Sequence, residues 1–170
     1  MNTSEFLAGF AHPLSGADHI LAMLAIGLWG VVAGGRALWA WPAAFVTMVV
    51  VGFLAETLGL RLPFVDAAIA ASVVVLGLLI SLAVKAPVWS GAVIAGVFAL
   101  FHGHAHGTEA VAAGLHLTTY AAGFVIATAF LHALGLGAGF AFARTAGEPL
   151  LRVTGGLIAV GGMALMATPA

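Results

Sequence analysis

Apolar residues run through this chain in six long blocks, and the short segments between the blocks hold most of the charged residues. A helix needs about 20 consecutive apolar residues to cross the hydrocarbon core of a bilayer. The blocks therefore predict an all-α, polytopic membrane protein with about six transmembrane helices. Spans of this size leave no room for a soluble domain, so residues 1–170 are expected to form a single integral membrane transport domain. The expected spans are Ser15–Val32, Ala37–Thr57, Phe64–Val84, Val88–His106, Leu115–Ala143 and Leu150–Ala167.

Glycines recur at a spacing of four residues inside these blocks, in the pairs Gly30/Gly34, Gly103/Gly107 and Gly135/Gly139. Small residues at this spacing allow membrane helices to approach each other closely. Prolines fall near the block boundaries, as Pro63, Pro87 and Pro149 do. A proline at a helix start does little harm because its missing N–H would be unpaired there.

Composition narrows the function further. The chain is 63% hydrophobic and 6% charged, with a mean hydropathy of +1.19, a formal net charge of −1 and no cysteine. These values exclude a basic nucleic-acid surface, thiolate metal sites and thiol catalysis. Lys85 is the only lysine, and no glycine-rich P-loop precedes it, so ATP hydrolysis by that route is excluded as well.

The basic residues predict an orientation. Arg36, Lys85, Arg144 and Arg152 fall on the side of the first, third and fifth loops, and only Arg61 falls on the other side. Cytoplasmic loops carry the excess of Lys and Arg. Both termini are therefore expected outside the cytoplasm. The first residues lack the basic and apolar regions of a signal peptide, so either the first span inserts unaided or a signal was removed.

Residues 101–109 place three histidines and a carboxylate in a segment that is otherwise apolar. On a helix of 3.6 residues per turn, His102, His106 and Glu109 share one stripe, at angles of about 0°, 40° and −20°. Two histidines at this spacing can chelate one metal ion. His104 lies on the other side of the helix, where an outer-surface or loop position is the competing interpretation.

A second group of polar residues opens the first span, with His12, Asp18 and His19. Ser15 followed by Asp18 resembles a capping box, which explains the acid but neither histidine. The predicted orientation brings this group to the same membrane face as the His102 stripe. Imidazole and carboxylate ligands suit Ni²⁺, Co²⁺, Zn²⁺ or Cu²⁺. We therefore expect one external metal site made from His12, Asp18, His19, His102 and His106. Glu109 is expected either to bind the metal directly or to contact one of the residues that do.

Other polar residues are secondary candidates. Asp66 is either an acid behind the ligands or a first-turn residue that suits the helix dipole. His116 is expected in an outer loop, where histidines can collect metal loosely. His132 lies deep in the fifth span, and a hydrogen bond to Thr128 is its commoner explanation, with a way-point on an ion path as the alternative. Glu56 is expected to be structural.

Three classes of function fit a membrane protein with such a site. A transporter needs ligands that release the ion and polar groups beyond the site, which Thr128 and His132 supply. A zinc-dependent intramembrane hydrolase would instead use the metal to activate water. A di-haem protein should pair its histidines near mid-membrane, whereas these gather at one end. We therefore expect a transporter with no prosthetic group rather than an enzyme.

The two histidine groups resemble those of the HupE/UreJ family of nickel and cobalt permeases. The motif H-x5-D-H matches His12, Asp18 and His19, and F-H-G-x-A-H-G-x-E matches the segment from Phe101 to Glu109 without a gap. The resemblance implies uptake of Ni²⁺ or Co²⁺ across the bacterial inner membrane, from the periplasm, without an ATPase subunit. Family members typically carry a signal peptide, so this sequence is expected to be a mature form with periplasmic termini. The choice between the two metals, the coupling ion and a homo-oligomer stay open.

Overall fold

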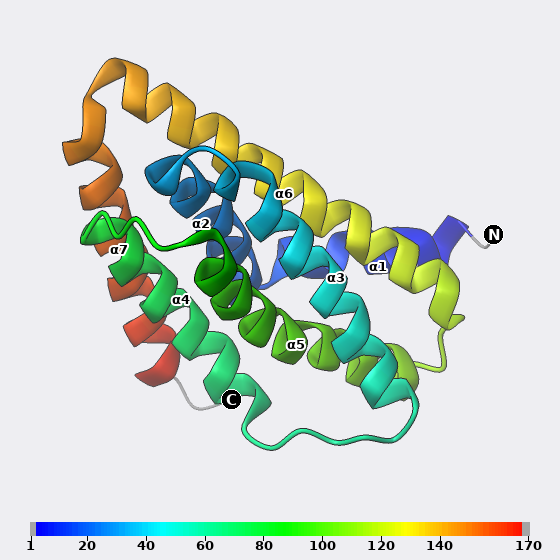
Figure 1. The fold of residues 1–170 in the computed structure, drawn as a ribbon. Helices are drawn as coiled ribbons and strands as arrows, with labels where there is room; N and C mark the ends of the chain where they lie inside the picture. The colour runs from blue at the N-terminus through cyan, green and yellow to red at the C-terminus, as the bar shows by residue number, and fades with distance from the viewer. Residues whose placement is uncertain (1–2, 168–170) are drawn as a thin grey trace.

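The computed structural model describes residues 3–167, which fold into seven α-helices with no strand in that range (Figure 1). The helices are α1 (Thr3–Ser15), α2 (Ala17–Ala33), α3 (Ala37–Thr57), α4 (Val65–Ser81), α5 (Val88–Ala112), α6 (Leu117–Thr145) and α7 (Gly147–Ala167). The predicted class is confirmed: the chain is an all-α, polytopic membrane protein.

The number of spans differs from the predicted six. Four described helices are long and apolar enough to cross a membrane alone, namely α3, α5, α6 and α7. Helices α1 and α2 pass this test only as a pair, bent by 79°. Helix α4 has 17 residues, which at about 1.5 Å per residue reach roughly 26 Å, slightly less than a typical hydrocarbon core. The sequence pattern missed α1 because that helix is short and contains Pro13 near its end.

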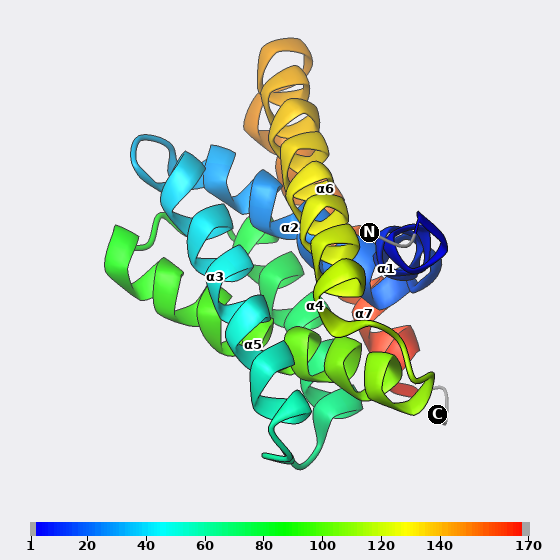
Figure 2. The same cartoon turned by 90° about the vertical axis from the view of Figure 1, so that its right-hand side faces the viewer.

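The helices associate in pairs, which run parallel for α3 with α5 and antiparallel for α4 with α7. Helix α3 packs along α5, α4 along α7, and the long α6 along both α1 and α2. Figures 1 and 2 both show α6 lying over the bent α1–α2 pair, with α3 and α5 side by side next to it. The bend between α1 and α2 therefore lies against the first half of α6 and close to α5, which is where the histidine motifs meet.

Glycine makes the close helix approaches possible. A Cβ on Gly103 of α5 would overlap the Val49 carbonyl oxygen of α3, and a Cβ on Gly52 would overlap the Leu100 carbonyl in return. Of the glycine pairs expected from sequence, Gly103/Gly107 contacts α3 and Gly135/Gly139 contacts α2. The third pair differs, because Gly34 ends α2 with a φ of +72° and nothing lies within 4 Å of its Cβ position.

We expect Gly103→Ala to destabilise the protein by about 1–3 kcal/mol, as overpacking of a close interface does. The added methyl group meets backbone, which cannot rotate away as a side chain can. Gly137→Ala is the matched control, because nothing lies within 4 Å of the Gly137 Cβ position on the same kind of helix. Thermal unfolding followed by circular dichroism in detergent measures both. Equal melting temperatures for the two variants would contradict the close α3–α5 contact.

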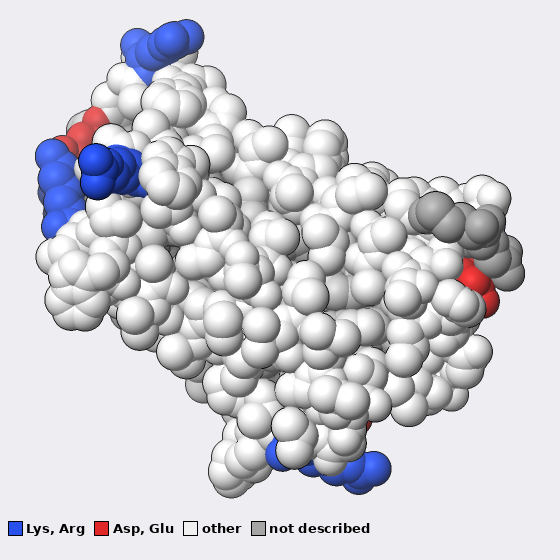
Figure 3. All heavy atoms as spheres, turned by 45° about the vertical axis from the view of Figure 1, so that its right-hand side comes forward, with Lys and Arg blue, Asp and Glu red and all other residues white. Residues whose placement is uncertain are grey.

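Charge separates the two ends of the molecule. The α2–α3, α4–α5 and α6–α7 connections lie at one end, here called the basic end, with Arg36, Lys85, Arg144 and Arg152. The other end, here called the histidine end, holds the α3–α4 and α5–α6 connections and Arg61. Figure 3 shows Lys and Arg gathered towards opposite ends with an uncharged surface between them. This distribution is typical of a membrane protein whose basic end faces the cytoplasm.

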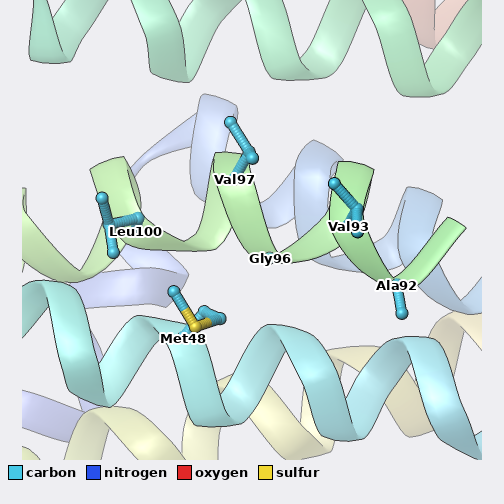
Figure 4. Close-up of a pocket in the computed structure, with 6 residues that line it drawn as sticks. All are labelled: Met48, Ala92, Val93, Gly96, Val97 and Leu100. Atoms are coloured by element: carbon cyan, nitrogen blue, oxygen red, sulfur yellow. The ribbon is translucent and has the colours of Figure 1, made fainter. Parts of the chain in front are cut away.

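A groove between α3 and α5 illustrates how apolar the middle of this surface is. It encloses about 420 Å³ and is lined only by apolar side chains, among them Met48, Val93, Val97 and Leu100 (Figure 4). Gly96 keeps it open, since a Cβ there would lie 3.1 Å from Met48 Cγ. None of these side chains offers the nitrogen or oxygen atoms that bind a hard or borderline cation, so the metal chemistry lies elsewhere.

Candidate metal centre

The break between α1 and α2 brings the first histidine motif into the interior. Gly16 connects the two helices in an extended conformation, with φ −95° and ψ 121°, and is itself the N-cap of α2. The capping box expected from Ser15 and Asp18 is wrong. The Ser15 hydroxyl donates to the His12 carbonyl, and Asp18 accepts from the His19 N–H at 2.7 Å. The chain turns at Gly16 instead, so His12 ends one helix and His19 begins the next.

Three histidines from three helices converge at this break. Ligand atoms of His12 on α1, His19 on α2 and His106 on α5 all lie within 4.8 Å of one another. Their ring centroids are 4.8 Å apart for His12–His106 and 5.0 Å apart for His19–His106. His106 is fully buried and His19 is 7% exposed. We call these three residues the histidine cluster.

Two carboxylates contact histidines of this cluster, each at the Nδ1 atom of the ring. Asp18 Oδ1 lies 2.8 Å from His19 Nδ1, and Glu109 Oε2 is paired with His12 Nδ1. A carboxylate that accepts from Nδ1–H fixes the tautomer and leaves the Nε2 lone pair available to a metal. The structure therefore places Asp18 and Glu109 beside the Nδ1 atoms of His19 and His12, where they can fix the orientation of these rings.

His102 adjoins the cluster one turn deeper along α5. Its Nδ1 lies 3.1 Å from the Phe98 carbonyl oxygen, and because a carbonyl can only accept, Nδ1 carries the proton. Its Nε2 is buried and has no hydrogen-bond partner among the described residues. The ring lies 4.9 Å from that of His19, measured between centroids. His102 thus extends the row of nitrogens inward.

The free nitrogens of these residues favour a cation. Among residues 3–167, His19 Nε2, His102 Nε2 and both ring nitrogens of His106 are buried without a hydrogen-bond partner. Buried polar atoms without a partner are costly, and such groups in native proteins call for an explanation. Imidazole nitrogens converging without thiolate suit Ni²⁺, Co²⁺, Cu²⁺ or Zn²⁺. A divalent transition metal would satisfy several of these nitrogens at once.

His104 does not join the cluster, in agreement with the expected helix geometry. Its Nε2 lies 2.7 Å from Glu56 Oε2 and 2.9 Å from the Leu62 amide nitrogen. The outer-surface or loop position considered for it is wrong, since the residue is 5% exposed within α5. The reason is that α3 covers this face of α5 and supplies Glu56 as a partner.

Two further candidates lie at the histidine end but outside the cluster. Asp66 is exposed in the first turn of α4 and lines a hollow of about 330 Å³ together with His104, Thr108 and Glu109. His116 lies in the connection before α6, as expected, and its Nδ1 is 3.0 Å from Thr118 Oγ1. Neither residue reaches the three converging rings.

His132 lies deep in α6 and does not make the hydrogen bond expected with Thr128. Both of its ring nitrogens and Thr128 Oγ1 are buried without a partner among the described residues. The His132 ring instead packs edge-to-face on Phe45, with centroids 5.0 Å apart and planes at 85°. Sharing a helix face brings two side chains near each other, but packing against the neighbouring helix decides where the ring points.

Sequence reasoning missed the aromatic residues around the centre. The Phe124 ring stacks on His106 at 4.7 Å, and the Tyr120 hydroxyl donates to Glu109 Oε2 at 3.4 Å. Phe45 contacts His102 from α3. Tyr120 is the only tyrosine of the chain. This was the one feature of the sequence that could have pointed to it as a residue of the site. The phenylalanines are indistinguishable in sequence from those that face lipid.

The chain is similar to known proteins along nearly its whole length. The family model described as HupE / UreJ protein matches residues 1–165. "Protein HupE" from Rhizobium leguminosarum bv. viciae is 46% identical over 160 residues, which cover 94% of this chain and 83% of that protein. No solved structure matches.

Proposed function

Because this chain belongs to the HupE/UreJ family, we propose that it is a secondary transporter for Ni²⁺ or Co²⁺. The ion binds first at the histidine end, between the α1–α2 break and α5, and then crosses towards the basic end. The chain acts as a transporter and not as an enzyme, needs no prosthetic group and works without an ATPase subunit.

The convergence of His12, His19 and His106 is the observation that carries this proposal. Three helices contribute one imidazole each to a space within 4.8 Å, and carboxylates orient two of the rings. A site assembled between helices can release its ion when one helix moves, whereas a site on a single helix cannot. Nitrogen donors also bind nickel and cobalt more tightly than the abundant Mg²⁺ and Ca²⁺, which prefer oxygen.

The charge distribution supports a direction for transport. The basic end faces the cytoplasm by the positive-inside rule, so the histidine end and both termini face the periplasm of a bacterial inner membrane. The ion then meets the histidine cluster first from outside. This arrangement supports uptake rather than export.

Metal uptake by the purified protein alone tests the proposal. Sealed proteoliposomes containing only this chain should accumulate radioactive ⁶³Ni²⁺ faster than protein-free liposomes, and unlabelled Co²⁺ should compete more effectively than Mg²⁺. The physical reason is that the donor set is built from imidazole nitrogen. Uptake no faster than in protein-free liposomes would contradict the transporter, and competition by Mg²⁺ equal to that by Co²⁺ would contradict the nitrogen site.

A further inference from the structure

The buried polar groups of α6 lie beyond the histidine cluster, on the path towards the basic end. At about 1.5 Å per residue, His106 and His102 lie roughly 9 and 15 Å along α5 from its end at Ala112. On the same scale, His132 lies roughly 22 Å along α6 from Leu117. His132 is therefore the deepest histidine measured from the histidine end.

Two polar side chains at this depth lack any partner. His132 is 2% exposed and Thr128 is fully buried, and neither ring nitrogen nor the Thr128 hydroxyl oxygen has a hydrogen-bond partner among the described residues. The two residues are four positions apart and share one face of α6. An intramembrane ionisable group is expensive and usually marks a functional path. Structural packing alone would be served better by an apolar residue here.

Phe45 contacts both His132 of this pair and His102 of the outer histidines. Its fully buried ring lies 5.5 Å from the His102 ring and 5.0 Å from the His132 ring, between centroids. Both histidine rings are steeply inclined to it, at 65° and 85°. One phenyl group thus contacts two histidines with buried, unpartnered nitrogens. An aromatic ring also attracts a cation that passes its face.

Space for an ion exists beside His132. A hollow of about 320 Å³ between α3 and α6 is lined by His132 together with Pro42, Val46 and Ala129. His132 is the only polar side chain among the residues that line this hollow, and Thr128 lies one helical turn away on the same face of α6.

From these contacts we propose that His132 and Thr128 form a second, inner site for the divalent ion, separated from His102 by the ring of Phe45. The inference rests on the proposed transport function, because the inner site receives the ion that the histidine cluster has bound. The outer site determines affinity, and the inner site determines how fast a bound ion leaves it towards the basic end.

The test compares uptake with binding in His132→Leu, a variant that removes the ligand and loses no hydrogen bond. The maximal rate of ⁶³Ni²⁺ uptake into proteoliposomes should fall at least tenfold. The affinity of the detergent-solubilised protein for Ni²⁺, measured by calorimetry, should stay within twofold of wild type because the outer site is intact. His132→Gln, which restores a ligand oxygen, should recover part of the rate. Leu131→Val alters a buried side chain next to His132 on α6 that does not line the hollow, removes no ligand atom and should transport as the wild type does.

The possible outcomes separate the two proposals. Wild-type protein that neither binds nor transports nickel contradicts the transport function itself. Wild-type transport together with an unchanged maximal rate in folded His132→Leu overturns the inner site alone. If His132→Leu does not fold, Thr128→Val takes its place, and a maximal rate equal to wild type in that variant overturns the inner site. Equal slowing by Leu131→Val and His132→Leu would assign the effect to packing and would also overturn it.

Discussion

Replacing His106 by alanine should lower the affinity for Ni²⁺ by about 100-fold or more and stop uptake at low nickel concentration. Loss of groups that only orient metal ligands typically costs 10–100-fold in affinity, so loss of a ligand itself should reach or exceed the upper end. His106 is the member of the histidine cluster that lies near both others, with ring centroids 4.8 Å from His12 and 5.0 Å from His19. Isothermal titration calorimetry in detergent gives the affinity.

His104→Gln is the matched control for this experiment. His104 lies two residues away on the same helix and is equally inaccessible, but its partner is Glu56 and not the cluster. Glutamine offers both an amide oxygen that can accept from the Leu62 N–H and an amide N–H that can reach Glu56, whereas alanine would leave both groups unpaired at a cost in stability. Nickel affinity should stay within about twofold of wild type. A similar loss of affinity in both variants would show that α5 contributes to binding only through its packing.

Uptake should be driven by the membrane potential, with an expected accumulation on the order of a thousand-fold. Moving one charge through 100 mV is worth about 2.3 kcal/mol, hence about 4.6 kcal/mol for a divalent ion. With about 1.4 kcal/mol for each factor of ten, this corresponds to roughly three decades. The chain contains no P-loop that would supply energy from ATP.

A potassium–valinomycin diffusion potential measures this directly in proteoliposomes with equal internal and external pH. An interior-negative potential should speed nickel influx, and collapsing the potential with external potassium should remove the effect. Exchange of one metal ion for two protons moves no net charge. In that case the rate would ignore the potential and respond to an acidic interior instead, which would overturn a uniport mechanism.

The helical stripe shows why part of the site could be predicted. His102, His106 and Glu109 belong to one helix, and a regular helix determines which residues share a face. The same argument separated His104 from them, and the structure places His104 against α3. The argument failed at the first motif, where a helix beginning at Ser15 with a capping box was expected. At Gly16, α1 and α2 are bent by 79° relative to each other. The direction of the backbone at a glycine depends on what packs around it, which a local pattern does not show.

The amino-acid sequence by itself determined the membrane class, the basic and histidine ends, and the two motifs that meet near one end. These properties follow from hydropathy, charge and local periodicity, which need no knowledge of contacts. Only the tertiary structure decided that Asp18 and Glu109 pair with His19 and His12, that Glu56 pairs with His104, and that Phe45 contacts both His102 and His132. Most of these contacts join residues far apart in the chain. They depend on how closely glycines let particular helices approach and on how each ring then packs, which no local pattern encodes.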